Sequence, residues 1–455
     1  MAKLKIKNSP LTINPLKVSQ SVGASLAFLG LANCMPLQHG ARGCTSFNKL
    51  FFMRHFREPI PLQTTAMELT AVIMGADKNV IEALRTICDR YHPEFIGLST
   101  TGLTATQGVS LTHSVAEFRT LYPQFNATAV IKVNTCDSQG GLEIGYQLAL
   151  RAVLDYVLPE QCHSEPDPSQ VNVLVSPLMT PRDIDVLKEW IESFGLTPIV
   201  LPDISTSLGG SLMAQGFMPL TQSGTCRQQI EKMVQSCATL VIGASLFPLA
   251  EVLQQRTGAP SFRFNGLHGL RQCDAFNRVL QQISGEPVPQ SQCRGRQQLQ
   301  DAMLDCQFRL GVSRIGIGVE CDLLLALAPA LEEVGAELSV VVIPSKPIEA
   351  QQEALNMLNC ETIQVADLGE LEHQGQHRNI EVLISNSHGQ AIAQHLQIGL
   401  LPAGYPLHRH AGGHARQWIG YEGSRQLLYS LDNLLAQYQH LLSPYHSKFW
   451  PQRAV

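Results

Sequence analysis

The chain has 455 residues, which is too long for one hydrophobic core and indicates roughly two to four domains. Hydrophobic residues make up 44% of the chain and charged residues 16%, so the composition is that of a well-buried globular protein and excludes a disordered one. The net charge of −5 and the scattered basic residues argue against a nucleic-acid-binding protein.

The N-terminus, residues 1–8, is rich in lysine, but no apolar signal region follows it, and no apolar run is long enough to span a bilayer. We therefore expect a cytoplasmic protein with no membrane partner, whose 12 cysteines are thiols, core residues or metal ligands rather than disulfides. No two cysteines form a Cys-x-x-Cys pair, which a cluster held within one chain usually shows. An iron–sulfur cluster would therefore use isolated cysteines or share its ligands with another chain.

Residues 1–160 are predicted to form an N-terminal α/β domain. A helical pattern follows Asn79, a buried strand is predicted at 95–100, and a strand at 129–135 precedes a long amphipathic helix that ends near Leu158. This alternation predicts a parallel, doubly wound sheet, and ligands of such sheets collect beyond the carboxyl ends of the strands.

A polar, proline-rich stretch at 159–170 is predicted to link this domain to a second α/β domain, 171–285. Its first helix is expected to begin at Pro181 with Thr180 as N-cap and to be closed by Gly195. The other elements predicted in this domain are strands at 171–176, 198–201 and 239–244 and helices at 228–236 and 247–256.

A second break at 284–296 precedes the third predicted α/β domain, 297–455, which carries a C-terminal helix at 425–442. The fold class we predict is therefore α/β, with three Rossmann-like domains and doubly wound, mostly parallel sheets. The other elements predicted in the third domain are strands at 314–319, 338–343 and 381–385 and a helix at 322–334.

The segment around Cys44 carries the chemistry that we consider first. Gly40 and Gly43 let the backbone pass close to a bulky group, and Thr45 or Ser46 is positioned to cap the helix that follows. A cysteine at a helix start feels the positive end of the helix dipole, which favours the thiolate, the form that binds iron. The alternative is a small buried cysteine in a glycine turn.

Several segments resemble the β-type subunits of the nitrogenase component 1 family, and some are similar to its cofactor-assembly branch, the NifEN scaffold family. The resemblance spans nearly the whole chain. The segments that carry it are 36–44, 54–59, 61–67, 98–103, 133–135 and 418–424.

The resemblance implies that Cys44 is a cofactor-binding and metal-ligating residue. The catalytic β subunit of the family has three ligands to an eight-iron cluster in this half, and the resemblance places them at Cys44, Leu62 and Gly102. Because leucine and glycine cannot bind iron, a simpler [4Fe–4S] cluster is implied, with one thiolate from Cys44 and three from a NifE-type partner subunit. The residues expected around that cluster are His39, Gly40, Gly43 and Thr45.

The function implied by the resemblance is that of a non-catalytic scaffold subunit with no catalytic residues. It would form an α2β2 heterotetramer with the NifE-type subunit, which mainly holds the precursor of the iron–molybdenum cofactor. The nitrogenase Fe protein would dock transiently. One alternative is the equivalent subunit of a vanadium-type scaffold or of a protochlorophyllide-reductase-like enzyme, which would supply a carboxylate ligand. Another is a stand-alone small-molecule-binding protein, a colourless monomer.

Other candidate ligands are interpreted as structural. Cys34 and Cys136 are possible substitute ligands, but small residues in packed loops explain both more simply. His408, His410 and His414 are spaced loosely for a metal site and are interpreted as part of a solvated or partner-facing loop. The sequence has no glycine-rich phosphate loop and no nucleophile elbow, which argues against a hydrolase.

Overall fold

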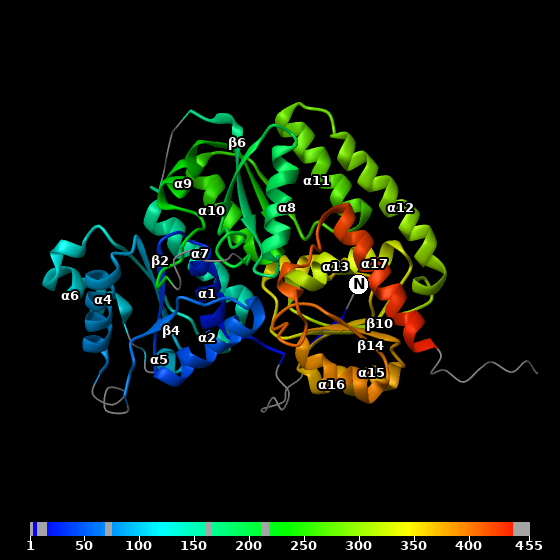
Figure 1. Ribbon diagram of the computed structural model, residues 1–455, viewed down its shortest axis with the longest axis horizontal. Helices are drawn as coiled ribbons and strands as arrows, with labels where there is room; N and C mark the ends of the chain where they lie inside the picture. The colour runs from blue at the N-terminus through cyan, green and yellow to red at the C-terminus, as the bar shows by residue number, and fades with distance from the viewer. Residues whose placement is uncertain are drawn as a thin grey trace, which may run out of the picture.

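The computed structural model describes residues 3–6, 16–68, 75–106, 108, 110–160, 165–210 and 218–439. The chain forms three α/β bodies, each built on one sheet in which all paired strands are parallel (Figure 1). This confirms the predicted fold class. Within the described part of the chain, no helix is long and apolar enough to cross a membrane.

The first body contains a four-stranded sheet in the order β3–β2–β4–β5. The two central strands, β2 and β4, are completely buried, as expected for a parallel sheet covered on both faces. On one side α1 and α7 cross in backbone contact, because a Cβ atom at Gly23 would lie 1.9 Å from the carbonyl oxygen of Leu142. The elements of this body are α1 (Gln20–Leu29), β2 (Cys34–His39), α2 (Arg42–Phe56), β3 (Gln63–Thr64), α4 (Asp77–Tyr91), β4 (Phe95–Thr100), α5 (Gly102–Thr106), α6 (Leu111–Leu121), β5 (Ala129–Val133) and α7 (Leu142–Val157).

The second body contains a four-stranded sheet in the order β7–β6–β8–β9. The helix predicted at Pro181 is confirmed: Thr180 accepts a hydrogen bond from the Asp183 backbone N–H, and Asp183 caps Thr180 in return. The predicted linker at 159–170 is partly wrong, because β6 begins at Asp167. The elements are β6 (Asp167–Val175), α8 (Pro181–Glu192), β7 (Thr197–Leu201), α9 (Arg227–Lys232), β8 (Ser236–Ile242), α10 (Phe247–Thr257) and β9 (Ser261–Phe264).

The third sheet has six strands in the order β1–β12–β11–β10–β13–β14. Its first strand, β1, comes from the N-terminus, so residues 3–6 join the last sheet of the chain rather than the first. Residues 284–296, predicted to be a break, are mostly helical: Gly285 ends α11 with a φ of 75°, and α12 begins directly after Pro289. The C-terminal helix α17 packs on α12 at the outer side of this body (Figure 1).

The elements of the third body are β1 (Lys3–Ile6), α11 (Gly269–Ser284), α12 (Gln290–Leu310), β10 (Arg314–Gly318), α13 (Cys321–Glu333), β11 (Glu337–Ile343), α14 (Glu349–Leu355), β12 (Thr362–Val365), α15 (Leu368–Arg378), β13 (Val382–Ser385), α16 (Gln390–Leu396), β14 (Gly399–Pro402) and α17 (Gly420–Gln439). Residues 440–442 of the predicted C-terminal helix lie outside the described residues.

A buried polar network joins the three bodies. The backbone N–H of Asp322, in the first turn of α13, donates to Glu143 Oε1 of α7 at 2.6 Å. The Asp322 side chain accepts from Ser176, which follows β6, and from Ser245 of the same second body. Gln351 of α14 donates to both carboxyl groups, at 3.0 Å each. Side chains from all three bodies therefore meet in one hydrogen-bonded cluster.

Candidate metal centre

The carboxyl ends of the parallel strands β2, β3, β4 and β5 lie along one edge of the first sheet, where ligands of such folds collect. The polar side chains at this edge bond to one another across the strands. Thr100 and Thr135 are linked through their hydroxyl and backbone groups, and His39 is bonded to Thr65. This edge supports the turn that leads from β2 into α2.

Cys44 occupies the first turn of α2, as predicted, and is an exposed free thiol. The cap, however, was predicted wrongly. The helix begins at Arg42 with Ala41 as N-cap, whereas Thr45 and Ser46 lie inside the helix. Ala41 forms no side-chain cap, so the amide donors of the first turn are not used by a capping side chain.

The two glycines that flank this turn have different environments. A Cβ atom on Gly40 would lie 2.4 Å from Thr101 Oγ1, so only glycine fits between β2 and the segment that begins α5. A Cβ atom on Gly43 would meet nothing within 4 Å. Gly40 is therefore needed for packing within the chain, while Gly43 leaves open space beside Cys44.

His39 lies beneath this turn and is completely buried. Its Nδ1 lies 2.9 Å from Thr65 Oγ1, and its carbonyl oxygen accepts hydrogen bonds from Thr101 and Thr104. Burial lowers the pKa of His39 to about 4, so the ring is neutral near pH 7. Among the described residues, neither His39 Nε2 nor Thr45 Oγ1 has a hydrogen-bond partner. We conclude that His39 holds the turn in place from below.

The two positions at which the resemblance placed further iron ligands differ in exposure. Leu62 is 2% exposed and belongs to the hydrophobic core cluster that contains Phe52 and Phe56. Gly102 is exposed at the start of α5, on the same sheet edge as Cys44. Of the two positions, only Gly102 therefore lies where a side chain would reach the surface around Cys44.

The two substitute thiols also have different surroundings. Cys34, at the start of β2, is completely buried, and burial raises the pKa of its thiol, as expected for a core residue. Cys136 lies at the ligand-binding edge of the sheet, half-buried, and its Sγ is 3.0 Å from Ser138 Oγ. That hydrogen bond lowers the pKa of the Cys136 thiol. Gln20 accepts from the Cys136 backbone N–H, a contact that no local sequence pattern indicates.

The histidine group near the C-terminus lies beside the other end of α2. Arg57 donates to the carbonyl oxygen of His408, whose ring is 5.3 Å from that of His388. His55 accepts from the Leu407 N–H, and burial lowers the pKa of His55 to about 3. Within the described ranges, no group of three or more His, Cys, Asp or Glu side chains is arranged to hold a metal ion.

Apolar side chains are exposed on α2 in the turns that follow Cys44. Phe47, Leu50 and Met53 follow at helical spacing with exposed fractions of 69%, 51% and 42%. Leu103, next to Gly102, is also exposed. Single exposed apolar residues are ordinary, but three within two turns of one helix are typical of a surface that another chain covers.

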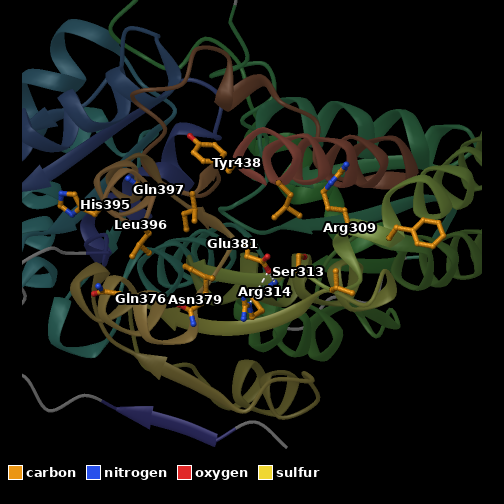
Figure 2. A pocket seen from close by; sticks show the side chains of 16 residues that line it. Arg309, Ser313, Arg314, Gln376, Asn379, Glu381, His395, Leu396, Gln397 and Tyr438 are labelled. Atoms are coloured by element: carbon orange, nitrogen blue, oxygen red, sulfur yellow. Dashed lines mark hydrogen bonds and ion pairs between the residues drawn. The ribbon is translucent and has the colours of Figure 1, made fainter. Parts of the chain in front are cut away.

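A separate cavity of about 680 Å³ lies in the third body (Figure 2). Its charged side chains are largely paired within the chain: Arg314 lies 3.6 Å from Glu381, and Arg309 is bonded to Asp432. It contains no cysteine and lies away from Cys44 in a different body. It is therefore not part of the candidate metal centre.

Comparisons with known proteins identify the family. The family described as nitrogenase component 1 type oxidoreductase matches residues 19–436. The nitrogenase iron-molybdenum cofactor biosynthesis protein NifN of Klebsiella pneumoniae is 39% identical over 447 residues, which cover 98% of this chain and 96% of that protein. The NifN protein of Rippkaea orientalis is also 39% identical, over 95% of this chain and 97% of its own length.

Solved structures agree with this result. The structure described as nitrogenase Cp1 at pH 6.5 aligns with a TM-score of 0.88 and 26% identity over 95% of both chains. A chain of nitrogenase Cp1 at pH 5 aligns with a TM-score of 0.69 and 13% identity over 96% of this chain and 92% of its own, which shows a shared fold. The chain therefore belongs to the nitrogenase component 1 family and, within it, to the NifN group.

Proposed function

We propose that this chain is the β-type subunit of a NifEN-type scaffold complex, on which the precursor of the iron–molybdenum cofactor of nitrogenase matures. In this proposal the chain forms an α2β2 heterotetramer with a NifE-type subunit, which holds most of the precursor. The relatives' names, which specify iron–molybdenum cofactor biosynthesis, favour this role over a vanadium-type or a protochlorophyllide-reductase-like one. The nitrogenase Fe protein docks transiently as the electron donor.

The observation that carries the site proposal is the exposed thiol of Cys44 at the amino end of α2. We propose that Cys44 supplies one of four thiolates to a [4Fe–4S] cluster whose other three ligands belong to the partner. The donor set fits a shared cluster, since Leu62 is buried in the core and Gly102 has no side chain. No three metal-binding side chains converge anywhere in the described ranges, so this part of the chain offers no complete shell of its own.

The surroundings of Cys44 support a cluster held between two chains. Open space beside Gly43 leaves room for a bulky group, and the exposed apolar face formed by Phe47, Leu50 and Met53 needs another surface to cover it. A cluster at that contact would be shielded from water on both sides. Shielding matters because solvent exposure is one of the factors that set the potential of an iron–sulfur cluster.

Several groups of this chain would act directly on the cluster ligand. Cys44 lies in the first turn of α2, at the positive end of the helix dipole, where an anionic group is favoured. Beneath it, neutral His39 and the threonines bonded to its carbonyl oxygen fix the turn without adding charge. When bound, a [4Fe–4S] cluster supplies one-electron transfer. In this proposal the chain orients one ligand of the cluster.

The proposal is tested by replacing Cys44 with alanine in the complex purified with its partner. We expect loss of the shared cluster, measured as about four fewer iron atoms per heterodimer and a weaker electron paramagnetic resonance signal of the reduced cluster. The chain should still fold and pair with its partner, because Cys44 is exposed, but loss of the shared cluster should lower the thermal midpoint of the complex.

The matched control is Cys293→Ala, which removes another exposed thiol from α12 in the third body. It should leave both the iron content and the signal at the wild-type level. Wild-type iron content and an unaltered signal in Cys44→Ala would refute the assignment of the ligand. The scaffold function is tested separately, by whether the complex accumulates cofactor precursor that activates nitrogenase lacking its cofactor.

A further inference from the structure

Two histidines on the surface of the third body face each other closely. His373 and His377 are four residues apart on α15, and both are exposed. Their Nε2 atoms are 3.2 Å apart, and their ring planes meet at 73° with centroids separated by 4.6 Å. Residues at positions i and i+4 are neighbours on a helix, and here both rings direct the same nitrogen to one point.

We propose that His373 and His377 form a two-nitrogen clamp for a divalent transition-metal ion. Metal–imidazole bonds are about 2.0–2.1 Å long. Two nitrogens 3.2 Å apart at that bond length subtend an angle of about 100° at the metal. This value lies between the angles of octahedral and tetrahedral coordination, so one ion reaches both nitrogens with little movement of either ring.

Hydrogen bonding between the two rings is the simplest alternative use of this geometry. In that arrangement one Nε2 carries a proton and donates it to the other. When a metal ion binds, the donor ring's proton moves from Nε2 to its own Nδ1, so both rings stay neutral and each Nε2 gives a lone pair to the ion. Imidazole nitrogen suits ferrous iron, nickel, copper and zinc, and affinity rises from ferrous iron through nickel to copper and is lower again for zinc.

The helix that carries the clamp is fixed to the protein on its other side. Leu368 and Leu371 are completely buried, and a Cβ atom on Gly375 would lie 2.9 Å from Ile380, so α15 is packed closely against the body. Figure 1 shows α15 beside α16 at the outer edge of the third body. Fixing the helix lowers the entropic cost of holding both ligands in register.

The clamp is an open site rather than a closed structural one. No third His, Cys, Asp or Glu completes it among the residues that the structure describes, so water molecules fill the remaining positions. His395 of α16 lies nearby in the fold, but its Nδ1 is 2.8 Å from Glu372 Oε1. We therefore expect moderate, exchangeable binding.

The test uses the full-length chain, purified with its partner, without a histidine tag and after treatment with chelator. Ni²⁺ is the probe, because thiolates select zinc and copper(I) more strongly. Isothermal titration should show one equivalent of Ni²⁺ that is lost or weakened at least about 10–100-fold in His373→Gln and in His377→Gln. The control His395→Gln also removes an exposed histidine and should bind like the wild type.

A relocated histidine tests whether binding needs two rings that face each other or only the same number of histidines. The double variant His377→Gln, Gln374→His keeps the number of histidines but puts the rings at adjacent positions, which do not face each other on a helix. It should not recover the lost equivalent. Wild-type Ni²⁺ binding in His377→Gln, or full recovery in the relocated variant, would overturn the proposal. None of these variants touches Cys44, so the cluster iron should stay unchanged in all of them.

Discussion

Replacing Gln351 by leucine is expected to weaken the junction between the three bodies. Its amide nitrogen donates to Glu143 and to Asp322, at 3.0 Å each, and the side chain is 1% exposed. Within this network no cation neutralises the two carboxyl groups, and the charge of Asp322 raises the pKa of Glu143 beyond the effect of burial. We infer that at most one of the two is ionised near neutral pH.

The expected loss of unfolding free energy follows from those two hydrogen bonds. A bond to an ionised carboxylate contributes roughly 1.5–3 kcal/mol and a bond to a neutral carboxyl roughly 0.5–1.5 kcal/mol. Gln351→Leu should therefore lower the free energy of unfolding by about 2–4.5 kcal/mol, a large part of a domain's usual 5–15 kcal/mol. The effect should be measurable as a lower thermal midpoint of the complex.

The buried carboxyl groups make the free energy of unfolding fall as the pH rises. Burial raises the pKa of both Glu143 and Asp322, so the folded state holds protons that the unfolded state releases. The stabilisation is complete below the unfolded pKa values, near about 4, and is lost as the pH rises toward the folded values. Glu320, with a pKa raised to about 7 by burial, contributes with the same sign. Buried His39 and His55 act in the opposite direction. Burial lowers their pKa values, so their contribution to the free energy of unfolding is lost as the pH falls below about 6.5.

The control for this pH effect is Glu143→Gln. It removes one ionisable group and keeps an oxygen that accepts from the Asp322 N–H. Thermal midpoints measured between pH 5 and 8.5 should fall with rising pH less in Glu143→Gln than in the wild type. Glu320 and the buried histidines are present in both proteins, so they cancel from the comparison. Parallel pH profiles for the two proteins, or a Gln351→Leu midpoint equal to the wild type, would refute the reasoning.

Two further predictions concern local packing and capping. Gly40→Ala should cost about 1–3 kcal/mol, because its Cβ would overlap buried Thr101, whereas Gly43→Ala, which meets open space, should leave the thermal midpoint unchanged or slightly higher. Equal effects of the two substitutions would contradict the assignment of Gly40 to packing. Asp183→Ala should cost at least about 3 kcal/mol, because it leaves the backbone N–H groups of Thr180, Trp418 and Ile419 without their acceptor. Asp183→Asn, which keeps an acceptor oxygen, should lose less in the same thermal assay.

The layered α/β fold can be read from local sequence patterns, because buried strands and amphipathic helices each depend on residues close together in the chain. The strand at 95–100 occurs as predicted, and Thr180 caps its helix as predicted, since both depend on residues within one turn or one strand. Cys44 in the first turn of α2 follows from the same local logic. The helix start was misplaced because Ala41 acts as the N-cap without any capping side chain.

Pairings between distant segments appear only in the folded chain. The N-terminal strand joins the third sheet beside residues 362–365, a pairing across more than half the chain that no local pattern encodes. The polar segment at 284–296 is predicted as a break from composition, yet residues 290–296 are helical because α12 packs on α17 and leaves its other face in water.

The candidate site also combines features that depend on local sequence with features that depend on long-range packing. The sequence indicated which thiol would be available, since a glycine-flanked cysteine at a helix start is a local feature. Only the fold shows that Leu62 is buried while Gly102 lies at the exposed sheet edge. It also brings Gln351 between two carboxyl groups that lie 179 residues apart in the chain. Burial and long-range hydrogen bonding arise from how the three bodies pack, which is why the sequence pattern alone could not supply them.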